Sequence, residues 1–137
     1  MIAYHGTDHD FDSFEKPVIN QMADRAAIGF WFTSSKDDAR QYGSTVLTCE
    51  LNFTKPYRTT RRELDFMAVS MPASAIVDQI RAQGFDSILV EAIKPDRALE
   101  EPGQPEQYVM FDPLTTPDAL PIVIMNREIC TPTRRKP

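Results

Sequence analysis

Apolar residues in this chain come in short runs separated by polar or proline-containing segments, which limits the fold to short elements. Eleven prolines against five glycines point the same way, towards many rigid connections. The short runs, several with period-two alternation, predict strands. These strands are expected over residues 1–5, 28–33, 45–51, 87–92, 108–111 and 122–126. Such short strands cannot build one long regular sheet, so a compact arrangement of small sheets is expected.

Helical spacing of apolar residues is confined to the middle of the chain. It predicts helices over 61–70 and 73–83, the second ended by Gly84. A shorter helix is expected from Ser34 or Ser35 through Tyr42, because a serine can cap it and acidic residues follow in its first turn. Strands with helices inserted midway predict an α+β domain built on two small sheets.

Several segments are expected to lie outside regular structure. Residues 15–27 predict a surface loop with a helical turn near 22–27, and Pro56 is expected to close the segment after the strand over 45–51. The proline-rich, acidic stretch 94–105 predicts a further loop, with Asp112-Pro113 stopping the next strand. A single domain is therefore expected over 1–127, followed by a basic, flexible tail over 128–137.

Composition excludes several classes of function. The formal charge of −5 counts against non-specific binding to nucleic acid, although a local basic patch could overcome it. Cys49 and Cys130 lie in no metal-binding pattern, so no metal is expected. No secretory signal and no run of about 20 apolar residues is present, which predicts a cytoplasmic protein without a membrane partner.

Five short blocks occur in order along the chain. They are YHGT at 4–7, GFWFT at 29–33, ARQYG at 39–43, GFDSI at 84–88 and QYVMFDP at 107–113. Their order and spacing resemble the diphtheria-toxin and poly(ADP-ribose)-polymerase group of ADP-ribosyltransferases, most closely its small phage and bacterial members. The resemblance runs from Tyr4 to Pro113 and implies a split β-sandwich of two small sheets with a few helices. NAD⁺ is the implied substrate, bound in a cleft between the sheets.

The resemblance also implies roles for individual residues. Tyr42 would stack on the nicotinamide ring and Trp31 would wall the pocket, a combination of stacking and cation–π attraction. Gly6 would let its backbone approach the carboxamide, because glycine carries no side chain. His5 would donate a hydrogen bond to a ribose hydroxyl, and Thr7 would support the adenosine side. Tyr4 and Phe32 belong to the same blocks and are expected to line the cofactor site.

The chain departs from the family pattern at two positions. Gln107 stands where these enzymes carry a catalytic glutamate, so it would bring an amide without net charge to the site. Glu106 is adjacent, but alternation along a strand would point it to the opposite face. Ala39 replaces a serine that bonds the carboxamide in the polymerases, which leaves carboxamide recognition to Gly6. His5, Tyr42 and Gln107 are the expected catalytic residues.

The leading hypothesis is a mono-ADP-ribosyltransferase acting on a macromolecular acceptor, a protein in preference to nucleic acid, and serving as a phage or bacterial effector. A catalytically silent binding module is the alternative, because Gln107 lacks the charge of glutamate. A nucleic-acid transferase is the weaker alternative. Each residue, taken alone, can also be explained as part of the core or of the surface.

The arginine pairs at 61–62 and 134–135 are expected to be surface charge, although one of them could meet the NAD⁺ pyrophosphate. No GxGxxG, P-loop or GxSxG sequence suggests another chemistry.

Overall fold

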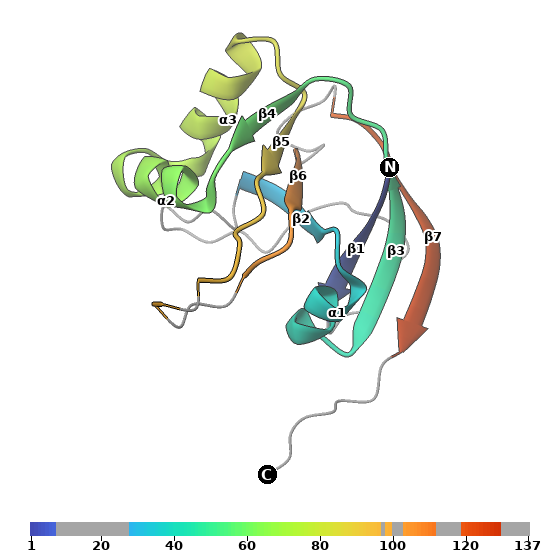
Figure 1. Cartoon of the computed structure of the whole chain (residues 1–137). Coiled ribbons are helices and arrows are strands. Elements are labelled where there is room, and N and C mark those ends of the chain that lie inside the picture. The colour runs from blue at the N-terminus through green and yellow to red at the C-terminus, as the bar shows by residue number, and fades with distance from the viewer. Residues whose placement is uncertain (8–27, 97, 100–102, 112–118, 130–137) are drawn as a thin grey trace.

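The fold of the protein is known from a computed structural model, which describes residues 1–7, 28–96, 98–99, 103–111 and 119–129. Within these residues the strands form one seven-stranded sheet in the order β4-β5-β6-β2-β1-β3-β7 (Figure 1). The strands are β1 (Ile2–Thr7), β2 (Gly29–Thr33), β3 (Thr45–Leu51), β4 (Pro56–Thr59), β5 (Ser87–Val90), β6 (Gln107–Phe111) and β7 (Ile122–Ile129). The helices are α1 (Lys36–Ala39), the 3₁₀ turn η2 (Arg40–Tyr42), α2 (Arg61–Ser70) and α3 (Ala73–Ala82).

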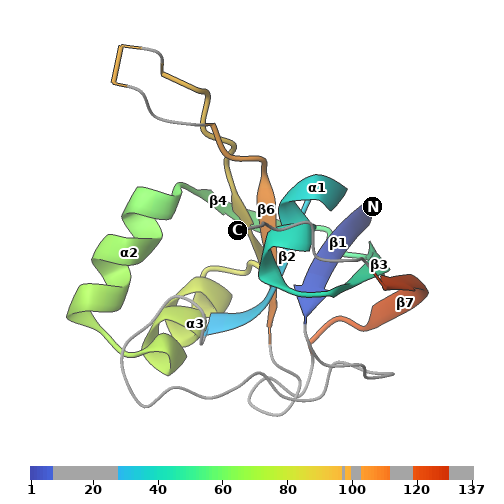
Figure 2. The ribbon, with the colours of Figure 1, turned by 90° about the horizontal axis from the view of Figure 1, so that it is seen from below.

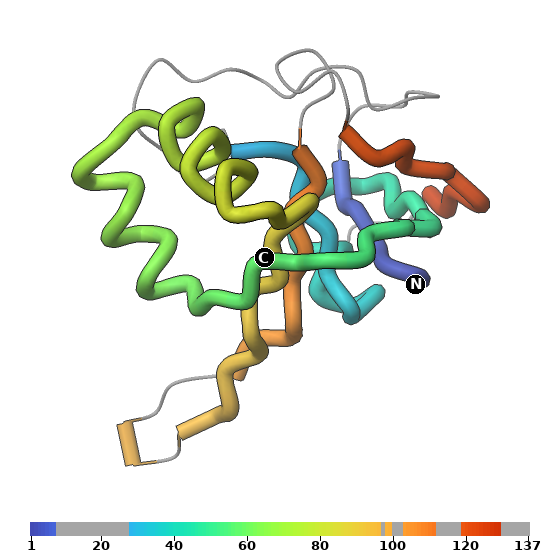
Figure 3. Tube along the Cα trace, turned by 90° about the horizontal axis from the view of Figure 1, so that it is seen from above, coloured from blue at the N-terminus to red at the C-terminus, as the bar shows by residue number. Residues whose placement is uncertain are grey.

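The sheet has a weak seam between β1 and β2. Their only register pair in the described residues is Tyr4 with Thr33, whereas β1 and β3 are paired along six positions from Ile2 to Thr7. Beyond this pair the two strands diverge, and the sheet parts into a β4-β5-β6-β2 half and a β1-β3-β7 half. Figures 2 and 3 show the two halves on either side of the molecule.

The two halves pack on each other through a shared apolar layer. One core cluster combines residues of both halves: Ala3, Leu47, Cys49 and Leu51 from β1 and β3, and Phe30, Phe32, Leu89, Tyr108 and Met110 from β2, β5 and β6. Because side chains alternate along a strand, these are the inward-facing positions of each half. The α+β class is therefore confirmed, and the two small sheets expected from the sequence correspond to the two halves.

Helices α2 and α3 cover the outer face of the β4-β5-β6-β2 half (Figure 1). Their apolar positions recur at helical spacing, and the buried ones are Leu64 and Ala68 on α2 and Ile76, Val77 and Ile80 on α3. These side chains form a second cluster with Ile28, Ile88, Val90, Val109 and Phe111. The outer face of this half, which also carries Gln107, therefore lies against α2.

Most boundaries follow from local signals. Ser35 caps α1 by accepting a hydrogen bond from the Asp38 N–H, as expected from the serine pair. Thr60 caps α2 in the same way through the Glu63 N–H, which fixes Arg61 as the first residue of that helix. Gly84 follows α3 with φ of +94°, a conformation that favours glycine.

Several boundaries differ from the sequence prediction; β5, for example, ends at Val90 rather than at residue 92. Pro56 does not close a segment but begins β4, which was missed; proline is tolerated there because it is the first residue of an edge strand. Strand β1 continues through Gly6 to Thr7, and β7 continues to Ile129, because β3 offers pairing partners along the whole length of both. The tail predicted over 128–137 starts too early, because Glu128 and Ile129 belong to β7 and pair with β3. The predictions of a helical turn near 22–27 and of a stop at Asp112-Pro113, and the rest of the predicted tail, lie outside the described residues.

Asp86, in the GFDSI block, ties the turn after β3 to the start of β5. Its carboxylate accepts hydrogen bonds from the Thr54 N–H and hydroxyl at 2.9 Å each, from the Lys55 N–H at 3.2 Å and from the Ser87 hydroxyl at 2.9 Å. Burial by itself would raise the pKa of Asp86, but these hydrogen bonds outweigh it and the pKa lies below its usual value. The GFDSI block therefore has a structural role, since Asp86 links the segment after β3 to the start of β5.

Replacing Asp86 by asparagine should lower the free energy of unfolding by about 1 kcal/mol, because the ionised acceptor of several hydrogen bonds is lost. Since the pKa of Asp86 is depressed in the native state, the carboxylate adds its full contribution to the free energy of unfolding above about pH 4. This contribution is lost as pH falls through the native pKa. Urea unfolding at pH 7 and at low pH measures both effects. Asp78→Asn on the exposed face of α3 is the control. An equal loss in both variants, or a loss independent of pH, would contradict this role.

Candidate functional site

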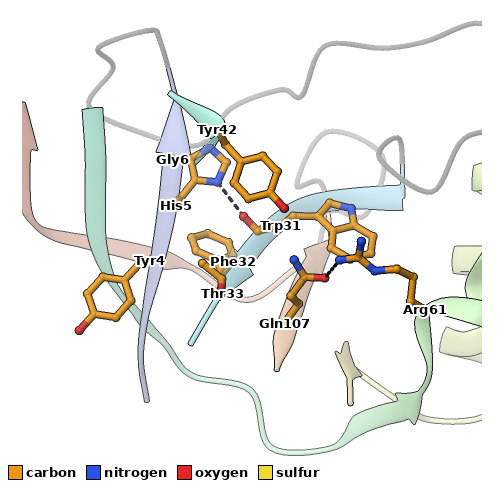
Figure 4. Close-up of a pocket in the computed structure, with 9 residues that line it drawn as sticks. All are labelled: Tyr4, His5, Gly6, Trp31, Phe32, Thr33, Tyr42, Arg61 and Gln107. Atoms are coloured by element: carbon orange, nitrogen blue, oxygen red, sulfur yellow. Dashed lines mark hydrogen bonds between the residues drawn. The ribbon is translucent and has the colours of Figure 1, made fainter. Parts of the chain in front are cut away.

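A cavity of about 250 Å³ lies at the seam where β1 and β2 diverge (Figure 4). Its lining comes from both halves of the sheet and from two helical segments. The residues are Tyr4, His5 and Gly6 of β1, Trp31, Phe32 and Thr33 of β2, Tyr42 of η2, Arg61 of α2 and Gln107 of β6. Residues more than 100 positions apart in the sequence thus meet at one hollow.

Seven of the nine residues singled out from the sequence line this cavity. They are Tyr4, His5, Gly6, Trp31, Phe32, Tyr42 and Gln107. Ala39 is fully buried, and neither it nor Thr7 belongs to the lining. The ring of Tyr4 points away from the other labelled side chains (Figure 4), and the Lys36 ammonium lies 5.9 Å from its centroid. The backbone of Tyr4 therefore borders the cavity, whereas its ring lies on the side of α1, close to Lys36.

His5 is held in one tautomer by the backbone of the neighbouring strand. Its Nδ1 lies 2.7 Å from the Trp31 carbonyl oxygen, which can only accept, so Nδ1 carries the proton and donates. Burial lowers the pKa of His5, and the hydrogen bond to Trp31 raises it by less, so the ring is neutral near pH 7. In this state Nε2 is a hydrogen-bond acceptor. The donation to a ribose hydroxyl that the family resemblance implies would need the protonated ring.

The aromatic lining is divided between the two faces of β2. Phe32 is 2% exposed and its ring centroid lies 5.4 Å from that of His5, on the interior side of the sandwich. Trp31 faces the other side, where it packs against the cluster beneath α2 and α3. Tyr42 is 54% exposed and borders the cavity from η2 (Figure 4). Two large rings from different elements therefore flank one opening, as stacking on a flat ligand requires.

Gly6 determines how closely η2 approaches β1. A Cβ atom at this position would lie 1.9 Å from the Ala39 carbonyl oxygen and 3.2 Å from the Tyr42 Cβ. Any side chain would therefore push away the segment that carries Tyr42. The glycine of the YHGT block is required for the placement of Tyr42 as well as for access to its own backbone.

Gln107 accepts a hydrogen bond from Arg61, a residue expected from the sequence to be surface charge. Arg61, the first residue of α2, donates a hydrogen bond from Nη2 to the Gln107 Oε1 (Figure 4). Because a guanidinium has no acceptor, the amide oxygen must face it and the amide nitrogen must face away. Arg61 is half-buried and lines the cavity, so the expectation of surface charge was wrong for this residue. Its role depends on how α2 is oriented, which no local pattern reports.

Glu106 does not place a carboxylate in the cavity. Its Oε1 accepts a hydrogen bond of 2.6 Å from the Tyr108 hydroxyl, on the side of β6 opposite to Gln107. Burial, followed by this hydrogen bond, raises the pKa of Tyr108, so its hydroxyl stays protonated and continues to donate. The alternation expected from the sequence is confirmed here, and none of the residues that line the cavity is acidic.

The α+β fold, with its sheet divided at a cavity, is compatible with an ADP-ribosyltransferase domain. The family model for the ADP-ribosyltransferase in polyvalent proteins matches residues 1–114, and the chain belongs to this family. ADP-ribosyltransferases use NAD⁺ as their substrate. Searches of curated proteins and of solved structures gave no match.

The described part of the chain holds neither a metal-binding cluster nor a membrane-spanning helix. No group of three or more His, Cys, Asp or Glu side chains there could hold a metal ion. No helix among the described residues is long and apolar enough to cross a membrane. The buried thiol of Cys49, whose pKa burial raises to about 12, belongs to the core of the sandwich.

His5 should titrate with a pKa below about 6.5 and keep its proton on Nδ1 when neutral. Long-range ¹H–¹⁵N spectra across pH 4.5–8 would show both properties, with His9→Gln assigning the two histidines. Because the unfolded chain takes up the proton at higher pH, the free energy of unfolding should fall as pH drops from about 6.5 through the native pKa. A neutral ring protonated on Nε2 would contradict the hydrogen bond to Trp31, and a pKa above that of a free histidine would contradict burial as the larger influence on the His5 pKa.

Gly6→Ala should lower the free energy of unfolding by about 1–3 kcal/mol, because the new methyl group overlaps backbone rather than a flexible side chain. Thermal unfolding measures this loss, and the neighbouring Thr7→Ala variant, outside the cavity, is the comparison. Equal stability of the Gly6→Ala and wild-type proteins would show that η2 does not approach β1 as closely as described.

Proposed function

We propose that this protein binds NAD⁺ in the cavity at the seam and transfers a single ADP-ribose to a macromolecular acceptor. The observation that carries the proposal is the convergence of His5, Trp31, Tyr42 and Gln107, from four elements, on one hollow. A cavity of about 250 Å³ is slightly smaller than the roughly 300–1,000 Å³ of pockets that enclose a whole small ligand. It suits the nicotinamide ring and its ribose, with the rest of NAD⁺ lying along the surface.

Each lining group then has a physical task. Tyr42 and Trp31 stack on the two faces of the ring, and the Gly6 backbone meets the carboxamide. His5 accepts a hydrogen bond from a ribose hydroxyl through Nε2, the unprotonated nitrogen of its neutral ring. In the reaction the bond between the ribose C1 and the nicotinamide nitrogen breaks, and nicotinamide leaves with the bonding electrons. A nucleophilic oxygen or nitrogen of the acceptor bonds to C1 and releases its proton to solvent.

The acceptor we propose is a protein. The chain carries a net charge of −5, which is unfavourable for approach to a phosphate backbone. A role as a phage or bacterial effector acting in the cytoplasm completes the proposal and rests on the resemblance of the sequence blocks.

The lack of charge on Gln107 and its hydrogen bond with Arg61 favour a second candidate function, a domain that binds NAD⁺ without cleaving it. In the enzymes that this chain resembles, a carboxylate at this position stabilises the positive charge that develops on the ribose. Gln107 has no charge, and its oxygen already accepts a hydrogen bond from the Arg61 guanidinium. The cavity therefore holds a cation where the reaction needs an anion.

Calorimetry with NAD⁺, followed by incubation with adenylate-labelled NAD⁺ and cell lysate, separates these functions. The enzyme should bind NAD⁺ and label a protease-sensitive acceptor; Tyr42→Ala and His5→Ala should reduce labelling at least tenfold. Phe66→Ala is the matched control for Tyr42, because Phe66 is an exposed aromatic residue on α2 outside the cavity. Binding without label transfer supports the module, and nuclease-sensitive label would move the acceptor to nucleic acid. Absence of binding at millimolar NAD⁺ would overturn both functions.

A further inference from the structure

Three polar side chains of the cavity lining come from three different elements and converge on the Gln107 amide. Thr33 of β2 and Gln107 of β6 lie directly opposite each other in the antiparallel register, and both are buried. Side chains of such a pair lie on the same face of the sheet and close enough to touch. Arg61 reaches the same cavity from α2 and donates a hydrogen bond to the Gln107 Oε1 (Figure 4). The amide is therefore flanked by a β2 side chain and by the guanidinium.

The first turn of α2 holds Arg61 in this place. Thr60 caps the helix by accepting a hydrogen bond of 3.1 Å from the Glu63 N–H, and the Thr59 hydroxyl donates to the Glu63 carboxylate at 2.8 Å. Arg61 is the first residue of the turn that these contacts fix. A positive side chain is unfavourable at a helix N-terminus, where the helix dipole is also positive, so the charge of Arg61 does not stabilise α2. Its hydrogen bond to Gln107 indicates a role in the cavity instead.

Arg61 determines which end of the Gln107 amide a ligand meets. The last torsion of a glutamine side chain is broad, so a glutamine can present either its oxygen, which accepts, or its nitrogen, which donates. A guanidinium can only donate, so it binds the oxygen. The nitrogen then points away from Arg61, to the side where Figure 4 shows Thr33. Contact with Arg61 thus converts a group of either polarity into a hydrogen-bond donor.

Thr33, which was not among the residues expected at the site, is a fixed neighbour of this donor. Its Oγ1 accepts a hydrogen bond of 3.2 Å from the Ser35 N–H, just before α1. This contact and its burial hold the Thr33 side chain in one orientation. Thr33 therefore provides a reference against which the orientation of the Gln107 amide can be measured.

We propose that Arg61 is a positioning residue, which turns the Gln107 amide so that its nitrogen donates a hydrogen bond to a ribose oxygen of the bound ligand. The inference rests on the proposed binding of NAD⁺ in this cavity. A ribose hydroxyl oxygen can accept from Gln107, while a hydroxyl proton can be donated to the unprotonated Nε2 of His5. Arg61 then contributes to affinity through Gln107 rather than by touching the ligand. Loss of one such hydrogen bond corresponds to about fivefold in affinity.

NMR on the free protein tests the orientation without any ligand. Nuclear Overhauser contacts should join the Gln107 side-chain NH₂ protons to the Thr33 side chain in the wild type. They should weaken by at least half in Arg61→Met, which removes the donor but keeps an unbranched stem. Arg61→Lys, which can still donate to the amide oxygen, should keep them. Arg62→Met, at the exposed next position outside the cavity, is the matched control and should behave as wild type.

Calorimetry with NAD⁺ tests whether Arg61 acts through Gln107. Arg61→Met should weaken NAD⁺ binding about fivefold in the wild-type background. In the Gln107→Met background the same change should not weaken binding further, because the amide that Arg61 orients is already absent. Arg61→Lys should bind NAD⁺ within about twofold of the wild type, which a purely local disturbance of α2 would not predict.

The outcomes separate this inference from the proposed function. Absence of the contacts between Gln107 and Thr33 in the wild type, or contacts of equal strength in Arg61→Met, would overturn the positioning role and leave the NAD⁺ site intact. Equal weakening of NAD⁺ binding by Arg61→Met in both backgrounds would show that Arg61 acts on the ligand independently of Gln107, which also overturns it. Failure of the wild type to bind NAD⁺ would overturn the role of Arg61 together with the site.

Discussion

The divergence of β1 and β2 after a single register pair is the constraint on which the site depends. If the two strands continued side by side, the Trp31 carbonyl would be satisfied by a backbone N–H and no cavity would separate the halves. Because pairing stops at Tyr4 and Thr33, the His5 imidazole donates a hydrogen bond to that carbonyl instead. One break in the ladder thus fixes the histidine tautomer and opens the hollow beside Gly6.

The same break explains why the site needs elements from the whole chain. The two halves are held together by the shared core of Phe30, Phe32, Leu47 and their neighbours, while η2 and α2 approach the seam from different sides. The position of Tyr42 depends on contact with Gly6, and that of Arg61 on the Thr60 cap. The cavity is therefore a product of tertiary packing, although its individual residues lie in short local motifs.

This distinction decides what could be predicted from the sequence. His5, Tyr42, Trp31 and Gln107 lie in blocks whose order was visible, and the Ser35 cap and the helix over Arg61–Ser70 follow from local signals. The strand beginning at Pro56 could not be predicted locally, because only its parallel pairing with β5 makes those four residues a strand. Arg61 was misjudged for a similar reason, since an arginine next to another arginine resembles surface charge until the orientation of α2 is known.

The pairing of Arg61 with Gln107 changes how the missing glutamate should be understood. A glutamate at position 107 would lie beside the guanidinium and form an ion pair, so its charge would be largely neutralised before any substrate bound. Restoring the carboxylate alone would therefore not restore the electrostatics that ADP-ribosyl transfer needs. The amide and the arginine form one unit: the amide tolerates a neighbouring cation, and the cation orients the amide. Arg61 of α2 and Gln107 of β6, 46 residues apart, together set the charge of the described cavity lining.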